Sequence, residues 1–286
     1  EGIQMKLIDF DAQFARYAQE YIRAHKAEFK NMDEAEAQMP EIYLRWLNQA
    51  ADWLDGRTPG EWFSQYSDPE ELVSLAREYL REKFDLIFLD PPYADDLLER
   101  IADLGEAAVP ALMKMAGEYE QSPELAMTAL NLLIEIGSEQ PLELCLDVIE
   151  RAGDRQELSE VASELLQGLG KAAKEPVLSR MEHAGGEAKA AFLDVLCNFP
   201  GDERIYKYAQ DAFRTSFDRR ALYASYLAKL GDPRAVEVLR EALELTDLNY
   251  LDYIEIVHAI EALGGEVETE REFNGDPYYE SLKDMR

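Results

Sequence analysis

The sequence has few of the residues that usually build catalytic and metal centres. It contains two cysteines and three histidines in 286 residues. His25, His183 and His258 lie in separate helical patterns, without an HExxH or Cys-His spacing. Cys145 and Cys197 lie in the apolar patterns LELCLDVI and FLDVLCNF, where a free thiol behaves as a small apolar side chain. We therefore predict no metal site, no disulfide framework and a reducing compartment.

Long apolar runs and the common catalytic motifs are also missing. No stretch of about 18 apolar residues occurs, and the N-terminal EGIQMKLIDFDAQ lacks the basic-then-apolar order of a signal peptide. No G-x-S-x-G, P-loop or dinucleotide fingerprint is present. The sequence thus predicts no membrane span, no catalytic residues, no cofactor and a cytoplasmic location. An active site assembled from distant residues is the open alternative.

Positive charge is scarce. There are 29 Lys plus Arg against 59 Asp plus Glu, a formal net charge of -30. Such a chain repels phosphate backbones and anionic lipid surfaces, which excludes nucleic acid and membranes as expected partners. A basic protein would be steered toward this surface, although solubility explains the charge equally well.

What the sequence does contain is a repeat of helical segments. An apolar residue followed by glycine ends successive segments, and the glycines are spaced 32, 33, 31, 30 and 33 residues apart. A second amphipathic segment follows each of the first five, so the unit is a pair of helices. The glycines are Gly105, Gly137, Gly170, Gly201, Gly231 and Gly264.

The second segments share a polar start and an apolar face. Pro110, Pro141 and Pro176 suit a first helical turn, where the missing N–H is harmless. The preceding glycine is expected to act as a left-handed C-cap of the first helix. Spacings of i, i+3, i+4 and i+7 predict two buried faces: Leu142, Cys145, Leu146 and Ile149, and Val236, Leu239, Ala242 and Leu243.

The segments LGDPRAVEVLREAL (230–243) and LGEAAVPALMKM (104–115) resemble HEAT repeats of the short PBS-lyase-like form. The resemblance covers about residues 94–264 and implies an all-α fold, an α-α superhelix of the right-handed HEAT/ARM-like solenoid type. The expected divisions are an N-terminal helical cap at 1–92, about five helix pairs plus a final helix at 93–264, and a C-terminal tail or capping segment at 265–286. Related families include scaffolds, adaptors, lyases and glycosylases, so the resemblance implies architecture rather than activity.

Residues 1–92 do not follow the repeat. Their periodicity predicts helices at about 6–29, 33–54 and 68–84. The third has a clear start, with Asp68 as N-cap and Pro69 at the first helical position. We interpret this block as a cap that covers the apolar end of the repeats.

The stretch FDLIFLDPPYADD (84–96) resembles the D-P-P-Y motif of amino-methyltransferases. That chemistry needs a Gly-rich methyl-donor turn and a sheet, and the sequence shows neither. The preferred interpretation is a linker in which two prolines break the helix, residues 86–89 contact the core, and Asp95 or Asp96 caps the next helix.

Carboxylates recur on the polar faces of the second helices. In HEAT solenoids these helices line the concave surface, so the resemblance places the carboxylates in a binding groove; the alternative is a solvated helix face. Arg204, Arg219 and Arg220, with Lys207 and Arg214, form a basic patch that is either an anion site or ion pairing between neighbouring repeats. The candidate groove residues are Glu143, Asp147, Glu150, Glu175, Glu182, Glu237, Glu241 and Glu244.

Aromatic residues gather in the N-terminal block, where Trp62 is a candidate partner-binding residue. The competing interpretation is a core role for the whole group: Tyr43, Trp46, Trp53, Trp62, Phe63 and Tyr66.

These patterns favour a non-enzymatic scaffold or adaptor that binds a protein or peptide, with a basic one favoured by charge, in an acidic groove. The alternative is a phycobilin-lyase-like enzyme or another enzyme with an unrecognised cleft. Partner identity and oligomeric state do not follow from the sequence.

Overall fold

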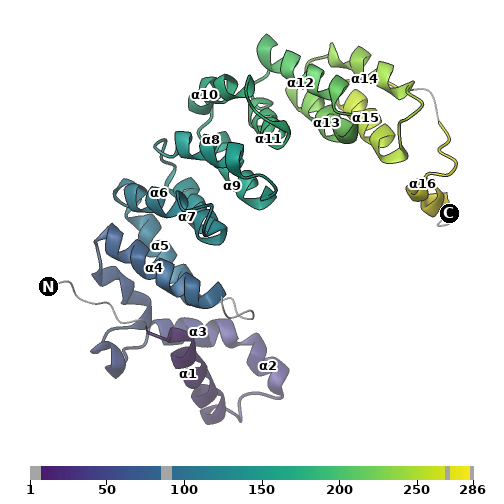
Figure 1. Ribbon diagram of the computed structural model, residues 1–286. Helices are drawn as coiled ribbons and strands as arrows, with labels where there is room; N and C mark the ends of the chain where they lie inside the picture. Colours follow the sequence, from purple (N-terminus) through teal and green to yellow (C-terminus); the bar gives the residue numbers. More distant parts are fainter. Residues whose placement is uncertain (1–7, 85–91, 268–270, 284–286) are drawn as a thin grey trace. The chain divides into compact units, whose positions relative to one another are not determined.

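The computed structural model describes residues 8–84, 92–267 and 271–283, and all regular structure in these ranges is helical (Figure 1). The all-α prediction is therefore confirmed. None of the helices in the described ranges is long and apolar enough to cross a bilayer. The chain divides into two compact units, Glu1–Pro141 and Leu142–Arg286. The domain boundaries expected from the sequence, near residues 92 and 264, stay predictions.

Unit 1 contains the N-terminal helices and the first repeat elements. Its helices are α1 (Phe10–Ala24), α2 (Met32–Ala37), α3 (Met39–Leu47), α4 (Pro69–Phe84), α5 (Pro92–Asp103), α6 (Val109–Ala116) and α7 (Pro123–Ile136). Short 3-10 turns lie between them: η1 (Asp52–Leu54), η2 (Pro59–Glu61), η3 (Phe63–Gln65) and η4 (Gly105–Ala107).

The N-terminal helices pack into the repeat elements of the same unit. Helix α1 packs against α3, and α4 packs against both α5 and α6. Helix α7 in turn packs against α5 and α6, so each pair covers the apolar side of the next. The start of α4 is as predicted, because Asp68 Oδ1 accepts hydrogen bonds from the backbone N–H groups of Glu70 and Glu71 at 2.9 and 3.3 Å.

The prediction of a single helix at about 33–54 is wrong in its length. The structure has α2, a break at Gln38, α3 and then the separate turn η1. Pro40 lies in the first turn of α3 and lacks the N–H that would continue α2 into α3. Asp55, at the end of η1, has φ 55°, a left-handed conformation that stops further helical winding.

The linker prediction is partly outside the described residues. The segment 85–91, which includes residues 86–89 and the first two residues of the D-P-P-Y motif, is not described. Helix α5 begins at Pro92, so Asp95 and Asp96 lie inside the helix and the prediction that one of them caps it is wrong. Proline at the first position supplies the helical φ that an N-terminal turn needs.

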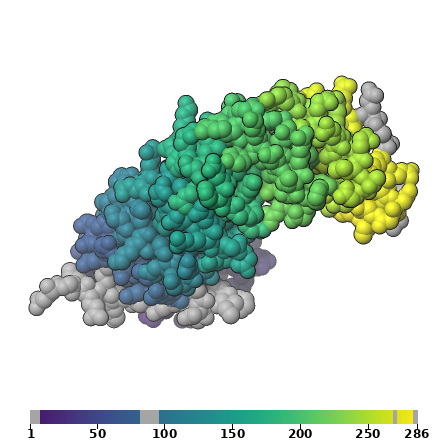
Figure 2. Space-filling model, turned by 45° about the horizontal axis from the view of Figure 1, so that its top comes forward, coloured from purple at the N-terminus to yellow at the C-terminus, as the bar shows by residue number. Residues whose placement is uncertain are grey.

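Unit 2 contains the remaining repeats, and its helices pack in sequence order. Helix α8 packs against α9, α10 against α11, α12 against α13 and α14 against α15. In Figure 2 the colours of this unit follow one another from teal to yellow, as expected when each pair contacts its sequence neighbours. The elements are α8 (Leu142–Arg151), α9 (Gln156–Gly168), α10 (Lys171–Met181), α11 (Gly186–Leu196), α12 (Glu203–Thr215), η5 (Phe217–Arg219), α13 (Arg220–Leu230), α14 (Ala235–Leu243), α15 (Tyr250–Ala262) and α16 (Pro277–Lys283).

The repeating glycines are the turning points of both units. All six have positive φ, from 56° at Gly105 to 85° at Gly201. Gly137 and Gly231 are left-handed C-caps of α7 and α13, as predicted. Gly170 differs, because its ψ of -127° places it outside the left-handed helical region, at the N-cap of α10.

Two details of the second helices differ from expectation. Pro110 lies in the first turn of α6 and Pro141 directly precedes α8, but Pro176 lies in the interior of α10. The preceding residues KAAKE favour helix and extend α10 back to Lys171, so the proline removes one internal hydrogen bond. In the predicted face of α8, Cys145, Leu146 and Ile149 are buried and Leu142 is partly exposed. In that of α14, Leu239 and Ala242 are buried, while Val236 and Leu243 are partly exposed.

Replacing Gly231 with alanine should destabilise unit 2 by about 1–2 kcal/mol, because a Cβ disfavours the left-handed conformation. The new Cβ would meet no atom within 4 Å, so the effect isolates backbone strain. Gly168→Ala is the matched control: its surroundings are equally open and its φ lies outside the left-handed range. The control should be neutral or stabilising by up to about 1 kcal/mol. Urea unfolding of both variants checks this, and equal losses would contradict it.

Candidate functional site

The carboxylates of α8 converge on one arginine of the next pair. The guanidinium of Arg180, on α10, lies 3.1 Å from Asp147, 2.6 Å from Glu150 and 3.1 Å from Glu143. The i, i+4, i+7 spacing puts the three acids on one helix face, which lets a single side chain reach all of them. Three acids around one cation leave a net negative charge on this surface.

A Gly-Asp-x-Arg sequence builds the contacts of the following pairs. Asp202 accepts hydrogen bonds from the backbone N–H and the Nε of Arg204, at 3.0 and 3.1 Å. The same guanidinium donates two hydrogen bonds, of 3.0 and 2.8 Å, to Glu175 on the preceding second helix. Arg204 and Lys174 hold the pKa of Asp202 well below its usual range, and Arg204 also lowers the pKa of Glu175.

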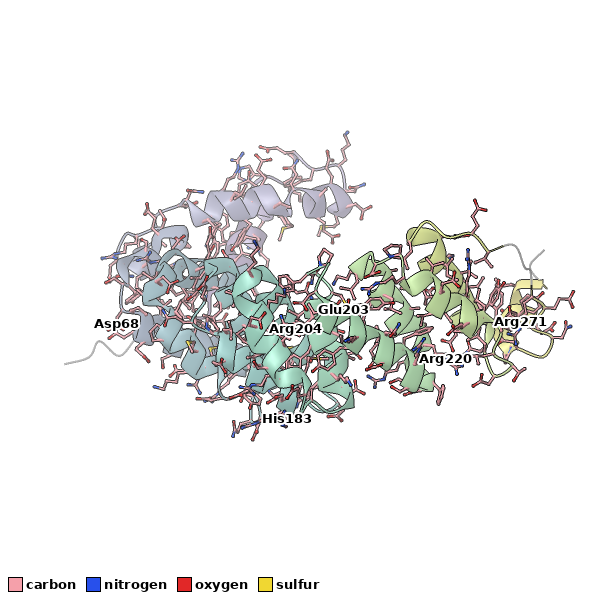
Figure 3. All side chains as sticks on the ribbon, turned by 90° about the horizontal axis from the view of Figure 1, so that it is seen from above. Asp68, His183, Glu203, Arg204, Arg220 and Arg271 are labelled. Carbon is pink, nitrogen blue, oxygen red and sulfur yellow. The ribbon has the colours of Figure 1, made fainter. Side chains whose placement is uncertain are left out.

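The same arrangement recurs 30 residues later, where Asp232 orients Arg234. Arg234 donates to Glu203 at 2.8 Å, and its guanidinium lies 4.3 Å from the ring centre of Tyr206. Figure 3 labels Glu203 and Arg204, the first two residues of α12. Glu203 therefore accepts from the arginine of the next pair, while its neighbour Arg204 donates to the preceding pair.

The first helices are joined by similar pairs. Arg219 pairs with Glu187 of α11, Lys229 lies 2.9 Å from Asp194, and Arg220 lies 3.2 Å from Asp247. For Arg204, Arg219 and Arg220 of the predicted basic patch, ion pairing between neighbouring repeats is thus confirmed.

The structure separates the candidate carboxylates into two groups. Glu143, Asp147, Glu150 and Glu175 form the ion pairs described above, Glu237 pairs with Arg240 in its own helix, and Glu241 lies 3.6 Å from Arg214 of α12. Glu182 and Glu244 are exposed and form no ion pair with any described residue. The sequence indicated the carboxylates and, for Arg204 and Arg214, ion pairing between repeats, but it did not indicate Arg180 as the shared partner of the three acids of α8.

The aromatic group of the N-terminal block is largely a packed cluster. Trp46 and Phe63 are buried, and the ring of Phe10 lies 5.7 Å from both Phe63 and Trp53. Trp62 is partly exposed and contacts Tyr66 edge-on at 6.2 Å. The core interpretation therefore holds for Trp46 and Phe63, and partner binding by Trp62 stays a prediction.

The described residues include neither a reactive cysteine nor a cluster of side chains that could bind a metal. Both cysteines are buried, and burial raises the pKa of Cys145 and of Cys197 to about 12, so each thiol is protonated at neutral pH and a poor nucleophile. No cluster of three or more His, Cys, Asp or Glu side chains that could bind a metal occurs among the described residues.

The family comparison agrees with this geometry. A family model described as PBS lyase HEAT-like repeat matches residues 224–244, from α13 across Gly231 to the end of α14. The chain contains a PBS lyase HEAT-like repeat. No curated protein and no solved structure matches the chain. The HEAT-like repeat includes Asp232 and Arg234, so one of the two Gly-Asp-x-Arg arrangements lies inside the matched residues.

The ion pairs of Arg180 should stabilise the packing of α10 on α8. We expect Arg180→Ala to lower the free energy of unfolding by on the order of 1 kcal/mol, because three carboxylates would then repel each other across α8. Arg45→Ala is the control, since Arg45 is exposed, forms its ion pair with Glu41 of the same helix and otherwise lies 5.8 Å from the ring centre of Tyr21. It should change stability less. Urea unfolding at low and high salt tests this, and an Arg180→Ala loss no greater than that of the control would contradict it.

Asp202 should make unit 2 sensitive to acid. Its pKa in the folded chain is lowered, so its ionised form stabilises the fold above the unfolded pKa of about 4, and this stabilisation is lost as the pH falls toward the folded value. Asp202→Asn should therefore destabilise by about 1 kcal/mol at pH 7, with a difference from the parent that shrinks below pH 4. Thermal unfolding across pH 2–7 measures this, with the exposed Asp218→Asn as control; a pH-independent difference would contradict the assignment.

Proposed function

We propose that this chain is a non-enzymatic scaffold that binds a basic protein or peptide on the acidic surface of its second helices in unit 2. This surface, the second-helix surface, consists of the exposed polar side of α8, α10, α12 and α14. HEAT-like repeats commonly mediate protein interactions. The observation that carries the proposal is the excess of carboxylate that remains on this surface after the arginines are paired.

The excess of carboxylate is located on α8 and α14, whereas α10 and α12 each contain three Lys or Arg and do not share it. On α8 three carboxylates share Arg180. At α14, Glu237 pairs with Arg240 and Glu241 with Arg214, and Glu244 forms no ion pair with a described residue. Most cations of the second-helix surface form ion pairs within the chain, whereas the exposed Lys171 and Lys207 form none with a described residue. A basic partner would therefore meet the excess carboxylates of α8 and α14 with few competing cations beside them, which raises its association rate and favours it over acidic partners.

Several of these carboxylates occupy positions that are unfavourable for a helix. Glu182 and Glu244 are the C-cap residues of α10 and α14, and Glu150 lies in the last turn of α8. A negative charge at a helix C-terminus opposes the helix dipole by about 0.3–1 kcal/mol. Glu150 is compensated by its ion pair with Arg180. Glu182 and Glu244 form no ion pair with a described residue, so their position at the less stable end of a helix supports a role in binding rather than in folding.

Glu182 and Glu244 allow a test that leaves the ion pairs intact. We expect the double variant Glu182→Lys, Glu244→Lys to lose most of the basic proteins that the parent chain captures from native lysate. The matched control is Glu157→Lys, Glu164→Lys, which makes the same change of charge at exposed positions of the first helix α9. The control should retain capture. Mass spectrometry of the captured proteins at low and raised salt measures the difference, because screening weakens charge-driven binding.

If both double variants lose the same proteins equally, capture reports net charge and not this surface. Unchanged capture by the Glu182→Lys, Glu244→Lys variant would contradict the proposed function directly.

A further inference from the structure

Among the described residues of unit 2, large apolar side chains are exposed in one region. Between Trp53 and Phe217 no described residue of this kind is exposed to a comparable extent. Five then occur within about sixty residues of sequence. A single exposed leucine is unremarkable in any protein, whereas a group confined to one region indicates an interaction site. The five are Phe217, Leu222, Leu245, Leu251 and Tyr278.

The fold brings together the starts of α13 and α15, where four of these residues lie. Helices α13 and α15 pack against each other, and the ion pair of Arg220 with Asp247 joins the start of α13 to the loop before α15. Leu222 and Leu251 lie in the first turns of these two helices, on the sides exposed to solvent. Tyr278 is held beside the start of α15 by ring contact with Tyr250 at 6.1 Å.

Phe217 is exposed and yet held in place. Its side chain is 64% exposed, and the guanidinium of Arg220 lies 4.8 Å from its ring centre. The Arg220 side chain is only 5% exposed and is oriented by Asp247. Figure 3 labels Arg220 near the start of α13. A ring fixed in this way loses little conformational freedom on binding, as is typical of an interface anchor.

The most exposed charges around Phe217 are negative. The side chains of Asp218 and Asp247 are 81% and 63% exposed. The nearby cations are engaged within the chain: Arg219 with Glu187, Arg220 with Asp247, and Arg271 with the carbonyls of Leu243 and Leu245. An apolar centre with an acidic edge is complementary to an apolar stripe with basic flanks.

We propose that these five residues, the Phe217 surface, bind an amphipathic helix of another protein that carries an apolar stripe flanked by Lys or Arg. The helix would lay its apolar residues on Phe217 and Leu251, with its basic side chains toward Asp218 and Asp247. This proposal rests on the proposed function in that the chain binds protein, but it uses the exposed starts of α13 and α15 instead of the second-helix surface. The acidic edge disfavours an anionic membrane.

The test uses the full chain and a labelled model peptide of about five helical turns, built from Leu and Lys with the leucines on one face. Fluorescence anisotropy should show saturable binding to the parent chain. Phe217→Ala combined with Leu251→Ser should raise the Kd by about tenfold or more, as expected for removal of interface anchors. Leu44→Ala, at a 59% exposed leucine of unit 1, is the matched control and should leave the Kd unchanged. Circular dichroism verifies that each variant is folded.

Several results would overturn the proposal. One is equal binding of an isomer peptide whose leucines are scattered around the helix, which would indicate charge attraction alone. Another is binding that survives the Phe217 and Leu251 changes but is lost in Glu182→Lys, Glu244→Lys; the proposed function would then stand without this surface. Failure of the parent chain to bind the peptide, or Phe217-dependent sedimentation with phosphatidylserine vesicles, would also contradict it.

Discussion

The structure depends on the inability of a single helix pair to bury its own apolar side. A pair of short helices has too little area to exclude water, so each must pack against the pair beside it in sequence. This requires the chain to reverse direction tightly after every first helix. Glycine at positive φ makes the reversal without a Cβ penalty, and all six repeating glycines have this conformation. The polar surface, including the carboxylates, is then displayed at a regular interval.

The regular interval also explains the pattern of ion pairs. Arg204 reaches Glu175, and Arg234 reaches Glu203, over 29 and 31 residues, close to one repeat. Each arginine is oriented by an aspartate two residues earlier, which reduces the side-chain entropy lost when the pair forms. Because each pair neutralises one cation and one carboxylate, the negative charge that remains on the surface comes from carboxylates in excess, such as those around Arg180.

The fold was predictable from the sequence because its determinants are local. The spacing of Gly105 to Gly264 and the capping aspartate Asp68 act within one or two turns of helix, where residue type is enough to predict conformation. The interior position of Pro176 was not predictable, because tertiary packing and the helix-forming KAAKE segment outweigh the preference of proline for a first turn. The candidate carboxylates were visible in the sequence, but the convergence of three of them on Arg180 was not, since it depends on how long side chains of different helices meet.

The two surfaces proposed for binding differ in how the fold maintains them. The second-helix surface is fixed by ion pairs between repeats, so its charge is tied to the packing of unit 2. The Phe217 surface is apolar, and its anchor is held by the buried guanidinium of Arg220. Charge provides rapid but salt-sensitive encounter, whereas a fixed aromatic ring provides short-range affinity that salt weakens little. A partner that uses both would need basic residues for its approach and an apolar stripe for its final position, which is the chemistry of a basic amphipathic helix.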